Sequence, residues 1–201
     1  MYREYLEDAR FFVALRRLDD EIAAEVRGKG CPRCGGRLHV ANYPRQPRGL
    51  GFEAQGELAL RLSLCCGREG CRGRVMPPSV RFFGRRWYVG VTFLLVSALL
   101  TERLSEKVLG RIEVEIGVSF ETLVRWRKWW REQFVRSRFW QGARGRFSPG
   151  VRESDELVAQ ILGRFGFGHG GDDGQALVRC LRFLSPLTTG GSWARTAVGG
   201  I

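Results

Sequence analysis

Four of the six cysteines are spaced as two pairs that can bind one metal ion. Cys31 and Cys34 lie in CPRCGG, where two thiolates separated by two residues can face one ion while the following glycines let backbone amides turn toward the sulfurs. The second pair lies in CCGREGC at 65–71, where the spacing is looser and Cys65, Cys66 and Cys71 are all candidates.

Strand alternation favours one choice of second pair. In LALRLSLCC the leucines from Leu58 to Leu64 alternate with other residues, and Cys66 falls on the leucine face, which must be covered. We therefore expect Cys66 and Cys71 to be the ligands, with Cys65 as the alternative. His39 can also replace a cysteine, although a histidine in a strand beside such a site is more often only a neighbour.

These cysteines predict a structural zinc site. Four thiolates in a closed tetrahedral shell leave no position for water, so the zinc would stabilise the segment and not catalyse a reaction. The N-terminus has no signal-peptide shape, which indicates a reducing, cytoplasmic location where paired cysteines favour metal over disulfides. In a bacterium we expect the protein to be associated with the nucleoid. Cys180, alone on a predicted helix, is expected to be a core thiol.

The positive charge of the chain is concentrated in its middle. The formal net charge is +12, and residues 31–150 carry 22 positive and 9 negative side chains. Such a block suggests a polyanionic partner, with nucleic acid as the first expectation and an anionic membrane surface as the second. The longest apolar run, Tyr88–Leu100, is shorter than the roughly 20 residues of a membrane-spanning helix, so we expect no membrane insertion.

The elements expected to position these residues are short strands followed by helices. Apolar periodicity predicts a helix over 3–27, strands in GRLHVANY and GELALRLSLCC, and a buried helix over 84–100. Further helices are expected over about 105–115, from 119 through RWRKWWREQF, over 153–163 and in QALVRCLRFL, and the last 16 residues are expected to be disordered.

Gly117, Val118 and Ser119 separate two predicted helices, as in a helix-turn-helix. The glycine allows a sharp turn, and Ser119 can cap the second helix through its hydroxyl. In that helix Phe120, Leu123, Trp126 or Val124, Trp130 and Phe134 are expected to face the core. The opposite side would present Glu121, Thr122, Arg125 and Lys128 to a major groove. Phosphate contacts are expected from Arg127, Arg131, Arg136, Arg138, Arg144 and Arg146. A merely solvated charged face is the alternative.

A second cluster interleaves arginines with aromatic residues. Arg81, Arg85 and Arg86 lie beside Phe82, Phe83 and Trp87, a composition that can stack the bases of a single strand. The alternative is that these aromatic residues enter the core at the start of the following helix.

Three segments in this order resemble small bacterial proteins associated with insertion sequences. CPRCGGRLHVANYPR, CCGREGCRGRVMPPSVRFFGRRWYVGV and GVSFETLVRWRKWW are similar to the zinc-ribbon and helix-turn-helix front ends of some transposases, over roughly 31–140. The second cysteine pair followed by CRGR also resembles the zinc ribbons at the tail of bacterial type I topoisomerases, which bind single strands. The chain departs from the helix-turn-helix pattern at Glu113, where a small residue is usual.

Together these features predict an α+β protein, with a zinc-ribbon β module followed by a mainly helical, helix-turn-helix-like domain. We expect an N-terminal helix over 1–30, the ribbon over 31–80, the basic helical domain over 81–146, and a loosely structured region with short helices over 147–201.

The resemblance implies a zinc-containing DNA-binding protein that acts as an accessory factor, regulator or truncated transposase of a mobile element. Double-stranded DNA is the expected ligand, with single-stranded DNA or RNA as alternatives. A protein-interaction adaptor that docks a separate transposase or polymerase is a further alternative. The chain shows no nucleophile with a neighbouring base and no framed set of carboxylates, so we expect no enzymatic activity.

Overall fold

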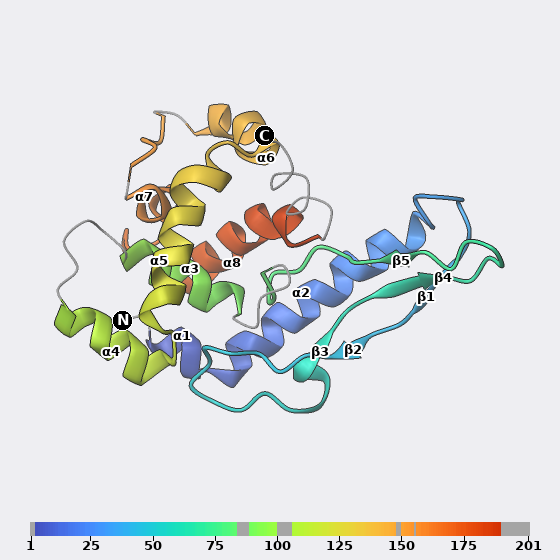
Figure 1. Ribbon diagram of the computed structural model, residues 1–201, viewed down its shortest axis with the longest axis horizontal. Helices are drawn as coiled ribbons and strands as arrows, with labels where there is room; N and C mark the ends of the chain where they lie inside the picture. The colour runs from blue at the N-terminus through green and yellow to red at the C-terminus, as the bar shows by residue number, and fades with distance from the viewer. Residues whose placement is uncertain (1–2, 84–88, 100–105, 148–149, 155, 190–201) are drawn as a thin grey trace.

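The computed structural model describes residues 3–83, 89–99, 106–147, 150–154 and 156–189, and it has an α+β architecture (Figure 1). The helices gather at one end of the molecule, and small antiparallel sheets extend from them along the long helix α2. The expectation of a mixed fold with a small β part and a larger helical part is therefore confirmed.

The N-terminal segment forms two helices instead of the single predicted one. α1 (Arg3–Glu7) is followed by Asp8, whose carboxylate accepts a hydrogen bond of 2.8 Å from the amide of Arg10 and so caps α2 (Ala9–Gly28). Phe12 and Leu15 of α2 are buried in the main core, together with Asp19, which the apolar pattern did not place there. Val26, near the end of α2, packs against the cysteines.

In the described residues, the β part consists of two short sheets. In the first, β4 (Leu64–Cys66) pairs with β1 (Leu38–Val40) on one side and with β5 (Arg74–Val75) on the other, so β1 lies at an edge. In the second, β2 (Tyr43–Pro44) pairs with β3 (Leu60–Arg61). All pairs are antiparallel.

The predicted strand over 56–66 is interrupted. Residues 56–59 form the 3₁₀ helix η1 (Gly56–Ala59), and the chain bends between β3 and β4, where the amide of Ser63 donates to the side chain of Asn42 at 3.1 Å. Because of this bend Arg61 and Ser63 are buried as well as Leu62 and Leu64, so the simple alternation of faces is wrong before β4.

The main core surrounds α3 (Gly90–Leu99), as its apolar composition predicted. Every residue from Gly90 to Ser97 is buried, and α3 contacts α5, α7 and α8. α4 (Glu106–Ile116) leads through a turn to α5 (Phe120–Lys128), which continues as the π-helical segment η2 (Trp129–Phe134). Then follow α6 (Arg138–Ala143) and the 3₁₀ helix η3 (Arg144–Arg146).

The region after 146 is not loosely structured over its described residues. α7 (Leu157–Arg164) and α8 (Asp173–Leu184), followed by the 3₁₀ helix η4 (Ser185–Thr188), pack into the main core. The helices predicted near 153–163 and in QALVRCLRFL are confirmed, and Cys180 is a buried core thiol. The predicted disorder of the last 16 residues is wrong at 186–188, which belong to η4 and include the buried Leu187 and Thr188, and residues 190–201 lie outside the described part of the chain.

In the described residues, no helix combines the length and the apolar character needed to cross a bilayer.

Candidate metal centre and cationic surfaces

Cys31, Cys34, Cys66 and Cys71 converge on one point and could hold a metal ion. Their four sulfur atoms all lie within 4.8 Å of one another. The Sγ atoms of Cys31 and Cys71 are 3.8 Å apart, and those of Cys34 and Cys66 are 3.5 Å apart. A tetrahedral zinc with Zn–S bonds of about 2.3 Å requires sulfur separations of about 3.8 Å, so this spacing fits such an ion.

The first cysteine pair is shaped by a tight backbone loop after α2. The amide of Gly35 donates to the carbonyl of Cys31 at 2.8 Å, and the amide of Cys31 donates to the carbonyl of Gly36 at 2.9 Å. Gly35 has a φ of +68°, which a residue with a Cβ rarely adopts. Gly36 lies so close to the cluster that a Cβ on it would be 3.1 Å from the sulfur of Cys66.

The second cysteine pair is held by β4 and the turn after it. The amide of Cys66 donates to the carbonyl of Gly73 at 2.9 Å, which closes the loop over 67–72. Cys66 is fully buried beside Leu38 and Leu64, as the leucine-face prediction required. The thiol of Cys65 points elsewhere, toward the carbonyl oxygen of Arg72 at 3.7 Å. The described cluster contains neither Cys65 nor His39, the two alternative ligands.

The surroundings make the four thiols unequal. The amide of Gly36, followed by the thiols of Cys71 and Cys66, lowers the pKa of Cys34 to about 7. The amide of Arg68 lowers the pKa of Cys66, but burial and the neighbouring thiols outweigh this effect and raise its pKa to about 12. A thiolate at Cys34 can therefore be stabilised by its neighbours, and a bound cation would replace the remaining protons.

The residues around the cluster are strongly cationic. We define the cysteine module as residues 31–40 and 62–75. Its exposed side chains include five arginines, namely Arg33, Arg37, Arg68, Arg72 and Arg74, against one carboxylate, Glu69. These cations offset the negative charge that four thiolates leave on a divalent metal.

The α5–α6 surface, which we define as the exposed side chains of 125–146, is the second cationic region. Arg125 and Lys128 of α5 are exposed, as expected, and so are Arg131, Arg136, Arg138, Arg144 and Arg146, while Arg127 is partly exposed. Lys128 lies 4.0 Å from Glu132, and Arg144 lies 3.3 Å from Glu153, so these cations have acidic neighbours.

Some residues of α5 lie differently from the prediction. Thr122 was expected to face a ligand, but it is buried, with 6% of its surface exposed, and accepts a hydrogen bond of 2.8 Å from Arg125. Phe120 and Val124 were weighed as core residues, but about half of each is exposed. Leu123, Trp126, Trp130 and Phe134 are buried as predicted.

The turn before α5 has the expected backbone but not the expected cap. Gly117 adopts a φ of +69°, which suits a sharp turn. Ser119 stands at the N-cap, yet its hydroxyl makes no capping bond to the helix backbone and lies 3.2 Å from the hydroxyl of Thr122.

The arginine–aromatic cluster at 81–87 belongs to the core where the structure describes it. Arg81 is completely buried, and its Nε donates to Asp19 at 2.9 Å. Phe82 and Phe83 are buried too, as the core alternative predicted. Arg85 and Arg86, predicted to contact nucleic acid, lie outside the described residues.

The cysteine module does not pack against α5. Figure 1 shows β1, β4 and β5 at the far end of α2 from α5, with α2 running between the two regions. The cysteine module and α5 are therefore separate regions of the described fold.

Sequence patterns missed two features of α2. One is the buried carboxylate of Asp19. The helical periodicity of the sequence could have revealed it, because it places Asp19 on the buried face of the helix. The other is a groove beside Ala23 and Ala24, where small side chains face the leucines of the β part.

No protein-family model, curated protein or solved structure matches the chain.

Proposed function

We propose that this protein binds one structural zinc ion and uses its cationic surfaces to bind DNA. The observation that carries the metal assignment is the convergence of four sulfur atoms that all lie within 4.8 Å of one another. A set of four thiolates favours zinc over hard cations, which prefer oxygen ligands. Zinc would join the loop after α2 to the β4 turn and thereby stabilise the cysteine module, whose own apolar core is small.

The α5–α6 surface is the proposed DNA contact. Eight positive residues and one acidic residue occur between 125 and 146, and most of the positive side chains are exposed. Clustered arginines bind phosphates and release counterions from the duplex, which provides affinity without sequence recognition. The turn at Gly117 and the exposed face of α5, with Glu121, Arg125 and Lys128, support a helix-turn-helix mode of docking.

The biological role we propose is that of an accessory, regulatory or truncated transposase-like protein of a mobile element. This part of the proposal rests on the ordered resemblance over 31–140. It predicts that a gene for a catalytic transposase lies next to the gene of this protein.

Two measurements test the proposal. Elemental analysis of the purified protein should find about one zinc per chain, because the four-thiolate cluster forms one closed site. Fluorescence anisotropy with a labelled duplex, and with one of its single strands, should show duplex affinity that falls steeply with salt. Absence of binding to the duplex, or affinity that does not change with salt, would contradict the DNA part without affecting the zinc part.

A further inference from the structure

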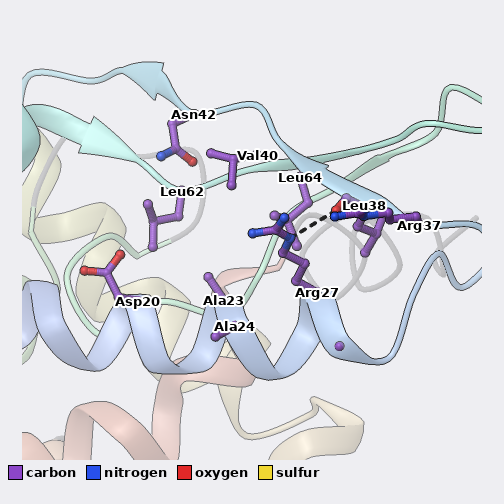
Figure 2. A pocket seen from close by; sticks show the side chains of 11 residues that line it. Asp20, Ala23, Ala24, Arg27, Arg37, Leu38, Val40, Asn42, Leu62 and Leu64 are labelled. Carbon is purple, nitrogen blue, oxygen red and sulfur yellow. Dashed lines mark hydrogen bonds between the residues drawn. The ribbon is translucent and has the colours of Figure 1, made fainter.

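A groove of about 500 Å³ separates α2 from the β part of the molecule. Figure 2 shows Ala23 and Ala24 on its helical side, with Val40, Leu62 and Leu64 opposite them. The space exists because α2 presents alanines and Gly28 where longer side chains would reach the leucines. Its volume lies within the range of about 300–1,000 Å³ that is common for ligand sites.

The strand β1 borders this groove with an open edge. Arg37 accepts a hydrogen bond from the amide of Gly67 at 2.9 Å, and the amide of Ala41 donates to Ser63 at 2.8 Å, so odd-numbered residues face the partner strand β4. By alternation, the backbone groups of Leu38 and Val40 face the other side, where the described chain has no further strand. The carbonyl of Leu38 indeed accepts from Nε of Arg27 on α2, at 3.2 Å (Figure 2).

The two ends of the groove differ in charge. Arg27 and Arg37 stand at one end, and both are exposed. Asp20 stands at the other end, where its carboxylate is paired with Arg16. The net charge that a ligand would meet in the groove is therefore positive, and it is concentrated at the end where Arg27 and Arg37 lie.

We propose that this groove binds an extended peptide segment of a partner protein, which adds as a strand beside β1. Backbone groups of the peptide would pair with the amide of Leu38 and with Val40, and a peptide amide would replace Arg27 as the donor to the Leu38 carbonyl, as in other cases of strand addition to a sheet edge. Every second side chain would enter the space beside Ala23 and Ala24, which accepts small or medium apolar groups. An aspartate or glutamate at one end would meet Arg27 and Arg37.

Other ligands fit this groove less well. Bases of single-stranded nucleic acid bind mainly by stacking on aromatic rings, and the described residues that line the groove include no aromatic side chain. A membrane surface would require a broad exposed apolar face, whereas Leu38, Leu62 and Leu64 are almost fully buried and Val40, at 59% exposed, is the large apolar side chain of the lining that a ligand can reach. An extended chain uses both the recessed apolar floor and the open backbone edge.

A displayed library of random heptapeptides tests the proposal on the full chain. Enriched peptides should alternate apolar residues and carry an acidic residue at one end. An Ala24→Trp substitution fills the groove from an exposed helical position, so it should weaken peptide affinity about tenfold or more. An Arg37→Glu substitution should weaken binding of the acidic peptide and restore binding of the same peptide with lysine in place of the acid.

The matched control is Arg33→Glu, which makes the same charge change on the cysteine module outside the groove. It should keep peptide affinity unchanged.

The proposal is overturned if no peptide is enriched, or if enriched peptides bind the Ala24→Trp variant as well as the original protein. It is also overturned if removal of 190–201 is needed before peptides bind, because the chain's own C-terminal segment would then be the occupant. DNA affinity should not change in the Ala24→Trp variant, so failure here leaves the proposed DNA binding untouched.

Discussion

Asp19 on α2 and Arg81, in the segment before α3, form an ion pair of 2.9 Å in which both side chains are almost completely buried. The other oxygen of Asp19 accepts from the amide of Val80 at 2.7 Å. The guanidinium of Arg81 also donates to the carbonyls of Leu58 and Leu60, at 2.8 and 2.9 Å. This pair therefore joins α2, the start of β3 and the entry to α3, which are far apart in the sequence.

We expect Asp19→Ala to lower the free energy of unfolding by about 3–5 kcal/mol, because it leaves the guanidinium of Arg81 buried without its counter-charge. Chemical denaturation followed by circular dichroism measures this change. Glu21→Ala, at an exposed position on the same helix, is the control and should have little effect. A similar stability for the two variants would show that the buried pair contributes nothing.

The metal cluster could be predicted from the sequence because two short sequence motifs specify its ligands. The CPRCGG spacing defines one half, and the alternation of Leu64 and Cys66 on one face of a strand selects the second half. The positions of α7 and α8 could also be predicted from their apolar periodicity, and that of α3 from its continuous apolar run.

The face of α5 was predicted correctly at Leu123 and Trp126 but not at Phe120 and Thr122. Counting back by four from the buried Phe134 and Trp130 reaches Trp126 and then Thr122, so a polar residue falls on the core face. Phe120 lies off that line and is exposed despite its apolar side chain. The adjacent Trp129 and Trp130 of η2 are both buried, and the periodicity of a single sequence does not predict a π-helical segment.

The interaction of Asp19 with Arg81 could not be predicted from sequence patterns either, because it joins residues 62 positions apart. In the sequence, Arg81 could only be grouped with Arg85 and Arg86 as a positive cluster. Its burial depends on carbonyl oxygens of Leu58 and Leu60, which the chain brings nearby only after folding. Composition alone cannot separate such an arginine from a ligand-binding one.

The cysteine assignment predicts different outcomes for two neighbouring substitutions. Cys66→Ser should abolish stoichiometric zinc, since Cys66 supplies one of four converging sulfurs. Cys65→Ser should keep it, because the thiol of Cys65 points away from the cluster toward the carbonyl of Arg72. Elemental analysis after dialysis decides between them, and equal zinc contents in the two variants would refute the proposed ligand set.

Gly36→Ala should weaken metal affinity without removing a ligand. The new Cβ would lie 3.1 Å from the sulfur of Cys66 and 3.3 Å from that of Cys34, so the cluster must open to make room. We expect a loss of affinity of about tenfold or more, as for other changes that displace ligands of a metal. Competition with a chromophoric chelator measures it. Gly28→Ala is the control, since its Cβ would meet no atom within 4 Å, and it should leave affinity unchanged.

Leu177→Ala tests whether α8 is part of the main core. Leu177 is fully buried, and its truncation should lower the free energy of unfolding by about 2–5 kcal/mol. The cooperative unfolding transition should shift as a whole, because α8 packs on α3 and α7. Gln175→Ala, at an exposed position on the same helix, should shift it little. If Leu177→Ala left the midpoint unchanged, α8 would not be part of this core in solution.

Arg136 and Arg138 provide the sharpest test of the α5–α6 surface, because both are exposed and lie two residues apart in the chain after η2. If each contacts a phosphate, the double substitution to alanine should weaken binding to all duplexes alike. It should also reduce the slope of log affinity against log salt by about 0.9 for each lost contact. Salt titrations by fluorescence anisotropy give this slope.

The matched control for this pair is the double substitution of Arg10 and Arg17 to alanine, which removes the same charge from exposed positions on α2. A general effect of net charge would weaken both double variants equally, since long-range attraction depends on total charge. A contact surface on α5–α6 would change the slope only in the Arg136 and Arg138 variant. Equal slopes in the two variants would therefore remove the α5–α6 surface from the proposal, even if the protein still bound DNA.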